Sequence, residues 1–220
     1  MLELIQPISK RDQVVRAMKD AILSGTIQPG ASIVESKIAQ QLGAGIPLIR
    51  EALIELEHQG FVQRTPYKGT TVTKLSPLDV RNIFALRVEL EALAIEWARA
   101  NITESDVEDL RQVIRKMEDA ARALDLPSFY ENDLAFHRKI WSLSGNPYLA
   151  HTLERLVVPL FAFFLMKTSR HHDSYIESAC SHAKIVEAIP TATPTELREI
   201  FRRSLVSWKD DMVQLLFSKE

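Results

Sequence analysis

The segment NDLAFHRKIW, residues 132–141, places a carboxylate and an imidazole at a spacing that can do chemistry. Asp133 and His137 are four residues apart, so on a helix they lie on the same face. Phe136 and Ile140 share that face, which predicts that both polar groups point into an apolar interior. Because an unpaired charge is costly there, three interpretations stay open: metal ligands, catalytic groups, or a hydrogen-bonded polar pair in a core.

Two more polar side chains are predicted to point inward from other helices. His182 shares a helical face with apolar residues such as Ile185, and Arg87 lies on a similarly apolar face. An arginine among apolar neighbours needs a partner anion. Glu91 one turn further on, Asp133 across the bundle, or a bound carboxylate could each supply it.

Asp133, His137 and His182 together form a set of one carboxylate and two imidazoles, which suits Zn, Ni, Mn or Fe. The same set with open coordination positions could also serve a metal-dependent enzyme built in a helical bundle, which is the alternative function. Against an enzyme, the sequence contains no HExxH motif and no nucleophile elbow. A polar network in which Asp133 only orients a histidine is the alternative to a metal site.

The composition is that of an ordinary soluble globular protein. The chain has 220 residues, of which 46% are hydrophobic and 25% charged, and a net charge of −2. Its single cysteine, Cys180, excludes an intramolecular disulfide and fits a reducing cytoplasm. The longest apolar run, 156–166, contains Pro159 and is too short to span a bilayer, so we expect a buried core helix and no membrane partner.

Residues 1–75 predict three short helices followed by a small β-hairpin, which is the order of a winged helix-turn-helix. A three-helix packing unit that binds no nucleic acid is the alternative. The helices are expected at about 9–24, 35–42 and 47–59, and the strands in FVQRT and TTVTK.

Residues 76–220 predict only helices. Ser76 as N-cap, Pro77 in the first helical position and Asp79 three residues after the cap form a helix start signal. The fold class is therefore mainly α, with the winged helix-turn-helix followed by a six-helix antiparallel bundle. The bundle helices are expected at about 77–100, 103–124, 128–143, 147–168, 173–189 and 194–217.

Motifs in both parts resemble one family. LIREALIELEHQGFVQRTPYKGTTVTKLSPLD resembles the winged-helix domain of the GntR family of bacterial transcription regulators. ALRVELEALAIEWA and NDLAFHRKIWSLSGNPYL resemble the FCD-type effector-binding helical domain of the FadR branch of that family. The resemblance implies a cytoplasmic homodimer that binds a palindromic double-stranded DNA operator through 1–75, and an effector through 76–220.

The resemblance also implies which residues meet DNA. Arg50 lies in the recognition helix, where a guanidinium can fork onto guanine or a phosphate. Lys68 at the wing tip would reach a phosphate or the minor groove, and Gly69 lets the backbone approach closely. Ser36 and Lys37, which open the second helix, are expected to contact phosphate.

One stretch departs from the family pattern. In AGIPLI, Gly45, Ile46 and Pro47 stand where a hydroxyl, an arginine and another hydroxyl are usual, so two expected DNA contacts are missing. The operator of a relative therefore cannot be transferred to this chain, and affinity is expected to depend more on dimerisation and the wing. A protein interaction scaffold with a head that no longer binds DNA is a third hypothesis.

The family resemblance bears on the metal as well. Many members of the FadR branch bind a divalent metal through an Asp, a His four residues later, a His on the penultimate helix and a His on the last helix. Asp133, His137 and His182 match the first three, but Ser204 stands in place of the fourth, and a serine hydroxyl is a poor ligand for zinc or nickel. With or without Zn, Ni or Mn, these four residues are expected to line a pocket. Arg87 would hold a small organic acid there through its carboxylate.

Overall fold

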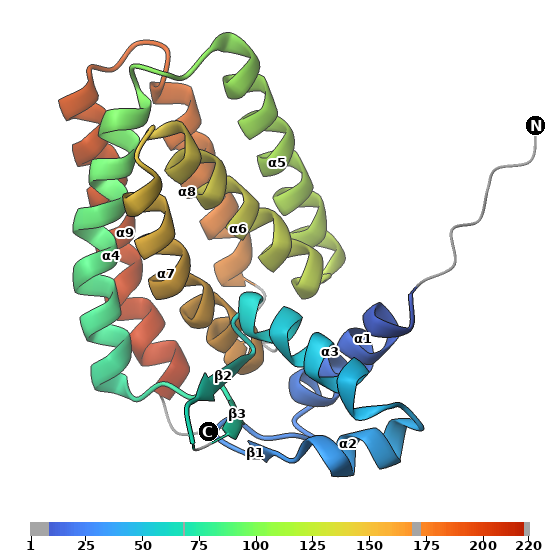
Figure 1. The fold of residues 1–220 in the computed structure, drawn as a ribbon. Coiled ribbons are helices and arrows are strands. Elements are labelled where there is room, and N and C mark those ends of the chain that lie inside the picture. Colours follow the sequence, from blue (N-terminus) through green and yellow to red (C-terminus); the bar gives the residue numbers. More distant parts are fainter. Residues whose placement is uncertain (1–8, 68, 169–172, 218–220) are drawn as a thin grey trace, which may run out of the picture. The chain divides into compact units, whose positions relative to one another are not determined.

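The computed structural model describes residues 9–67, 69–168 and 173–217. The chain divides into two compact units, Met1–Lys74 and Leu75–Glu220, each with its own core (Figure 1). We describe each unit by itself.

The N-terminal unit consists of three helices and a small antiparallel sheet with the strand order β1-β3-β2. Ser9 caps the first helix, because its Oγ accepts a hydrogen bond from the backbone N–H of Asp12 at 3.1 Å. The second helix ends at Gly43, whose φ of 59° favours glycine. The elements are α1 (Lys10–Leu23), β1 (Ser32–Ile33), α2 (Glu35–Leu42), α3 (Ile46–His58), β2 (Val62–Thr65) and β3 (Gly69–Val72).

The sheet has one more strand than the predicted hairpin. β1 pairs with β3 in antiparallel register, with Ser32 opposite Thr71. The backbone N–H of Gly30, at a φ of 84°, donates to the carbonyl of Val72 at 2.9 Å and brings the chain alongside. A two-residue strand has too few residues for an alternating pattern, so nothing in the sequence marks it.

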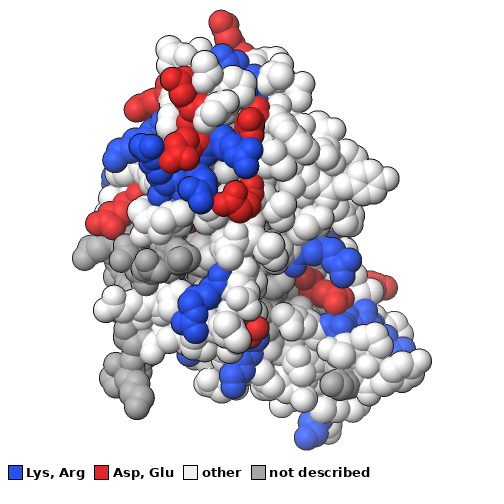
Figure 2. Space-filling model, turned by 90° about the vertical axis from the view of Figure 1, so that its left-hand side faces the viewer, with Lys and Arg blue, Asp and Glu red and all other residues white. Residues whose placement is uncertain are grey.

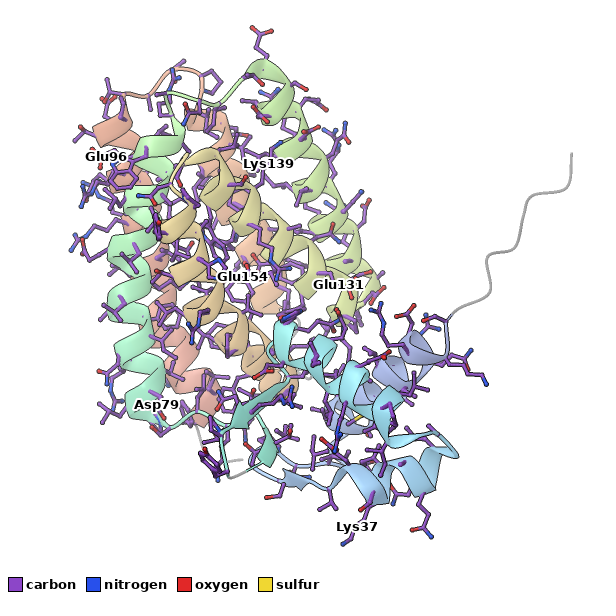
Figure 3. All side chains as sticks on the ribbon, viewed as in Figure 1. Lys37, Asp79, Glu96, Glu131, Lys139 and Glu154 are labelled. Carbon is purple, nitrogen blue, oxygen red and sulfur yellow. The ribbon has the colours of Figure 1, made fainter. Side chains whose placement is uncertain are left out.

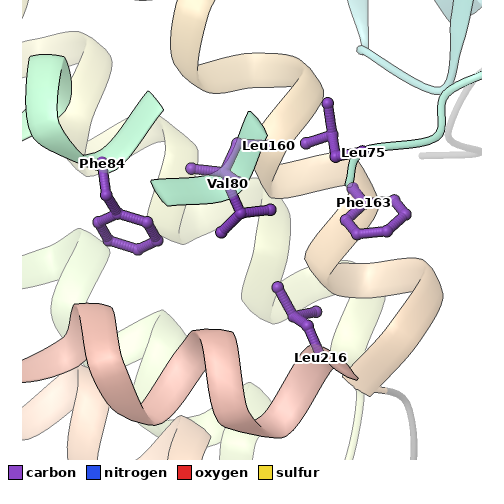
Figure 4. Close-up of a cluster of buried hydrophobic side chains, with 6 residues drawn as sticks. All are labelled: Leu75, Val80, Phe84, Leu160, Phe163 and Leu216. Carbon is purple, nitrogen blue, oxygen red and sulfur yellow. The ribbon is translucent and has the colours of Figure 1, made fainter. Parts of the chain in front are cut away.

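The C-terminal unit is a bundle of long helices, as predicted. Ser76 and Asp79 form a capping box at the start of its first helix. Part of the core, formed by apolar side chains of α4, α7 and α9 together with Leu75, is drawn in Figure 4. The helices are α4 (Pro77–Ala98), α5 (Glu104–Ala123), α6 (Leu126–Leu143), α7 (Pro147–Thr168), α8 (Asp173–Ala188) and α9 (Pro194–Phe217).

The start of α6 differs from the prediction. The helix was expected to begin at about residue 128, but its cap is Asp125, whose side chain accepts a hydrogen bond from the backbone N–H of Ser128 at 3.2 Å. The helix therefore begins at Leu126, two residues before the expected start, with Pro127 in its first turn. Aspartate and serine are both good N-caps, and LDLPS places one of each within reach of the same turn.

Among the described residues, Pro147–Lys167 of α7 is the helical segment whose length and composition would allow it to cross a membrane. Half of the tested window is buried inside the protein. Val157, Leu160 and Ala162 are completely buried, so the apolar character of α7 has an explanation in the bundle core.

Ion pairs join neighbouring helices on the surface of the bundle. Lys139 of α6 reaches Asp106 of α5 at 2.6 Å (Figure 3). On the opposite side of the bundle, Arg198 and Arg202 of α9 pair with acidic residues of α4, and Figure 2 shows the two charges intermixed there. Exposed pairs of this kind contribute little each, so the bundle depends on its core.

Candidate functional site

A cavity of about 80 Å³ lies inside the bundle, among α4, α6, α7, α8 and α9. Most of its wall is aromatic or aliphatic. Charged, imidazole and serine side chains interrupt that wall at a few places, which is the usual character of a small-molecule site. These residues are Arg87, Asp133, His137, Ser178, His182 and Ser204.

Arg87 is neutralised within its own helix. Its Nε donates to Oε1 of Glu91, one turn further along α4, at 2.7 Å, and both side chains are buried. Of the three partners considered for Arg87, the structure thus shows Glu91. Burial alone would raise the pKa of Glu91, but the charge of Arg87 and the contact with His137 lower it to about 2. Glu91 is therefore ionised at neutral pH.

His137 is held in one orientation by the same carboxylate. Its Nδ1 lies 2.6 Å from Oε2 of Glu91, so Nδ1 carries the proton. Its Nε2 faces the Nη2 of Arg87 at 3.1 Å. Burial lowers the pKa of His137 in spite of the attraction of Glu91, so the ring is neutral and its Nε2 accepts a hydrogen bond from Nη2 of Arg87.

His182 is oriented by its own helix. Its Nδ1 donates to the carbonyl oxygen of Ser178 at 2.7 Å, while its Nε2 lies 3.1 Å from Oδ1 of Asp133. Burial alone would lower the pKa of His182, but the carboxylate of Asp133 and the Ser178 carbonyl raise it. The charge of His182 in turn keeps the pKa of Asp133 low against the effect of burial. Each group of the pair thus favours the charged form of the other.

Three donor atoms converge in the cavity. One atom each from Asp133, His137 and His182 lies within 4.8 Å of the others. Both histidines have Nδ1 engaged outside the set and turn Nε2 toward it, which is how metal-binding histidines are usually held. The residues therefore fit a divalent ion with three protein ligands. When bound, such an ion would supply a positive centre for an anionic ligand.

Ser204, in the position of the expected fourth ligand, has a different partner. Its Oγ lies 2.6 Å from Oγ of Ser181 on α8, so the hydroxyl of Ser204, in the wall of the cavity, is paired with a serine beside that wall. Sequence reasoning missed this pair. It also missed the second role of Glu91, which orients His137 as well as neutralising Arg87.

The N-terminal unit, Met1–Lys74, is called the head below, and it presents Arg50 to solvent. Its side chain is 62% exposed, and its Nε donates to Oε2 of Glu35 in α2 at 2.7 Å. Ser36 and Lys37, in the first turn of α2, are also exposed, and Figure 3 shows Lys37 pointing away from the helices of the head.

Two residues of the wing were predicted to contact DNA, and the structure describes one of them, Gly69. Gly69 opens β3 with a φ of 87°, a conformation that disfavours any other residue, and nothing lies near the position a Cβ would take. Lys68 lies outside the described residues.

Both units match known families. Residues 10–72 match the bacterial regulatory proteins of the gntR family, and residues 82–207 match the FCD domain. The chain belongs to the GntR family. The three helices and wing of the head are thus the GntR part of the chain, and the cavity lies in its FCD domain.

Individual relatives agree with this assignment. The chain is 29% identical over 146 residues to "HTH-type transcriptional regulator McbR" of Escherichia coli K12, covering 66% of each chain. It is 30% identical to the "Probable D-xylose utilization operon transcriptional repressor" of Paenarthrobacter nicotinovorans, covering 81% of this chain and 77% of the relative. The solved structure of E. coli McbR has the same fold, with a TM-score of 0.72 at 22% identity, covering 94% of this chain and 99% of that one.

The sequence match spans slightly less than two thirds of the first relatives, at 65% or 66% of their length. The gntR family and these relatives are regulators of transcription and not enzymes. The metal-dependent enzyme considered as an alternative is therefore not retained.

Proposed function

We propose that this GntR-family chain is a ligand-responsive regulator of the FadR branch that binds a palindromic operator as a cytoplasmic homodimer. Residues 1–75 would bind DNA through Arg50, Lys68 and Gly69, with Ser36 and Lys37 on phosphates. Residues 76–220 would form the dimer and bind the effector.

The observation that carries the proposal is the combination of two sites in one chain. An exposed guanidinium lies on the second helix of a helix-turn-helix, and a cavity with a few convergent polar groups lies in a separate unit. A two-fold dimer reads two half-sites at a fixed spacing, so a ligand that changes the separation of the heads changes operator affinity.

The charges of the cavity support an anionic effector together with a metal. Arg87 is paired with Glu91, and His182 with Asp133, so the cavity without an ion has no excess positive charge. Zn, Ni or Mn held by Asp133, His137 and His182 would make it positive and favour a carboxylate. The effector would then be a small organic acid that fits between Arg87 and the hydroxyl of Ser204.

The proposal is tested by selecting duplexes from a random pool with the full-length protein. We expect a palindromic site to be enriched. Arg50→Ala should weaken binding to it about 5- to 150-fold, because that variant loses a base contact worth about 1–3 kcal/mol. Arg111→Ala removes an exposed guanidinium from α5 of the bundle and serves as the matched control, with unchanged affinity.

Two outcomes would contradict the proposal. If no duplex is enriched even at low salt, where phosphate contacts are strongest, the chain is the scaffold with a degenerate head. If Arg50→Ala binds the selected site as tightly as the wild type, α3 is not the element that reads the bases.

A further inference from the structure

The tip of the helix-turn-helix has no polar side chain. From Leu42 to Ile49 the sequence reads LGAGIPLI, so every residue there is apolar or glycine. Ile46, the first residue of α3, is 40% exposed, and Leu42, the last residue of α2, is 41% exposed. Gly45, the N-cap of α3, makes no side-chain hydrogen bond. The first turn of α3 can therefore offer only apolar contact and backbone groups to a partner.

The exposed apolar surface lies where a helix-turn-helix meets base edges, namely at the N-terminal residues of its second helix. Ile46 and Arg50 are four residues apart and lie on one face of α3. Their Cα atoms are separated by about 6 Å along the helix axis. Since base pairs are spaced by about 3.4 Å, both side chains can reach bases about two steps apart.

DNA carries one apolar group in its major groove that an isoleucine can recognise. This is the C5-methyl group of thymine, which the other three standard bases lack, so contact with it distinguishes sequences without any hydrogen bond. A protein partner could also cover this surface. Yet Arg50, Ser36 and Lys37 lie exposed on the same two helices, and together with an apolar tip they suit a nucleic acid better.

We propose that Ile46 contacts the C5-methyl group of a thymine in each operator half-site, within about two base pairs of the guanine contacted by Arg50. This inference rests on the proposed function. It replaces the hydrogen bonds that AGIPLI cannot make with an apolar contact, and so gives this chain an operator different from those of relatives that have polar residues there.

The test removes the methyl group from the DNA and leaves the wild-type protein unchanged. Each thymine of the selected operator is replaced in turn by deoxyuridine, which differs only in the missing C5-methyl group, and the Kd of the full-length protein is measured. We expect about fourfold weaker binding at one thymine per half-site, the factor that burying one methyl group gives. That thymine should lie beside the guanine whose replacement affects the wild type but not Arg50→Ala.

Two variants assign the contact to one residue. Ile46→Ala should bind more weakly and should no longer distinguish thymine from deoxyuridine at that position. Ile54→Ala is the matched control, because Ile54 is the same residue type on the same helix, is 41% exposed, and lies two turns beyond the tip. It should keep the full deoxyuridine effect.

The proposal is overturned if no deoxyuridine substitution changes the Kd, or if Ile46→Ala keeps the deoxyuridine effect. In either case the apolar tip covers another surface, such as a protein partner. A selection that enriches no duplex is a different result, because it contradicts DNA binding itself.

Discussion

Glu91 is the residue on which the charges of the cavity depend. One of its oxygens neutralises Arg87, and the other lies 2.6 Å from Nδ1 of His137. Asp133, the other carboxylate near His137, lies farther away, with its Oδ1 at 3.6 Å from Nε2. Removing one member of a buried ion pair leaves the other charge uncompensated, which costs far more than the pair contributes.

We expect Glu91→Gln to lower the free energy of unfolding by about 3 kcal/mol at pH 7, because Arg87 would be left buried without its counter-charge. Urea unfolding followed by circular dichroism measures this. Glu89→Gln, on the same helix but half-exposed at the surface, should leave the free energy nearly unchanged.

The same variant has a pH dependence with a fixed sign. The folded-state pKa of Glu91, about 2, lies below its ordinary value of 4.5. The stabilisation from its charge is therefore complete above about pH 4.5 and is lost as the pH falls toward 2. The difference between wild type and Glu91→Gln should shrink between pH 7 and pH 3, and an undiminished difference would mean that the lost contact is not electrostatic.

Helical spacing was enough to predict the inward position of the polar residues, and not enough to predict their partners. Arg87, His137 and His182 are all buried, as their apolar neighbours in the sequence indicated. The contacts of His137 with Glu91 and of His182 with Asp133 join α4 to α6 and α6 to α8, and such contacts depend on how helices pack. A serine pair at 181 and 204 could not be inferred for the same reason.

At the scale of elements, the sequence predicted what local patterns encode. The helices of both units lie close to their expected ranges, because caps and apolar periodicity are local signals. β1 was missed because only its pairing with β3, nearly forty residues away in the chain, makes it a strand. The start of α6 was misplaced because two good capping residues lie close together there.

That competition can be measured. Asp125→Ala should destabilise the protein by about 1 kcal/mol, because the first turn of α6 loses its side-chain acceptor. Ser128→Ala should have a much smaller effect, since only the backbone N–H of Ser128 takes part in the cap. Thermal or urea unfolding compares the two variants directly. A larger loss of unfolding free energy for Ser128→Ala would mean that Ser128, and not Asp125, caps the helix.

At the scale of the whole molecule, the connection between the units is short and fastened at both ends. Thr73 is buried in the head, where its Oγ1 donates to the carbonyl of Gly60 at 2.6 Å. Leu75 is buried in the core of the bundle, and Ser76 caps α4. Only Lys74 lies between these two anchors. α4, which starts here, also carries Arg87 and Glu91, so the helix that follows the connection is one of those that form the cavity.

We therefore expect occupancy of the cavity to alter DNA affinity. Protein stripped of metal and then loaded with Zn²⁺ to one equivalent, as measured by elemental analysis, should bind the selected duplex at least about fivefold more or less tightly than the stripped protein. His182→Ala should take up no metal and show no such change. A wild-type protein that takes up no metal would contradict the three-ligand site itself.

Because the connection is short, the effect of Zn²⁺ on duplex binding can be tested without changing the metal site or the DNA-binding residues. Inserting four glycine and serine residues between Lys74 and Leu75 changes none of the proposed metal ligands and none of the proposed DNA contacts. With the longer, flexible connection the protein should still take up Zn²⁺ and still bind the duplex. Its duplex affinity should, however, be nearly the same with and without Zn²⁺. Because coupling is reciprocal, the duplex should also change the Zn²⁺ affinity of the wild type by the same factor, and should not change that of the insertion variant. If the insertion variant keeps the full ratio, the signal passes through the dimer or through contacts other than the connection at residues 73–76.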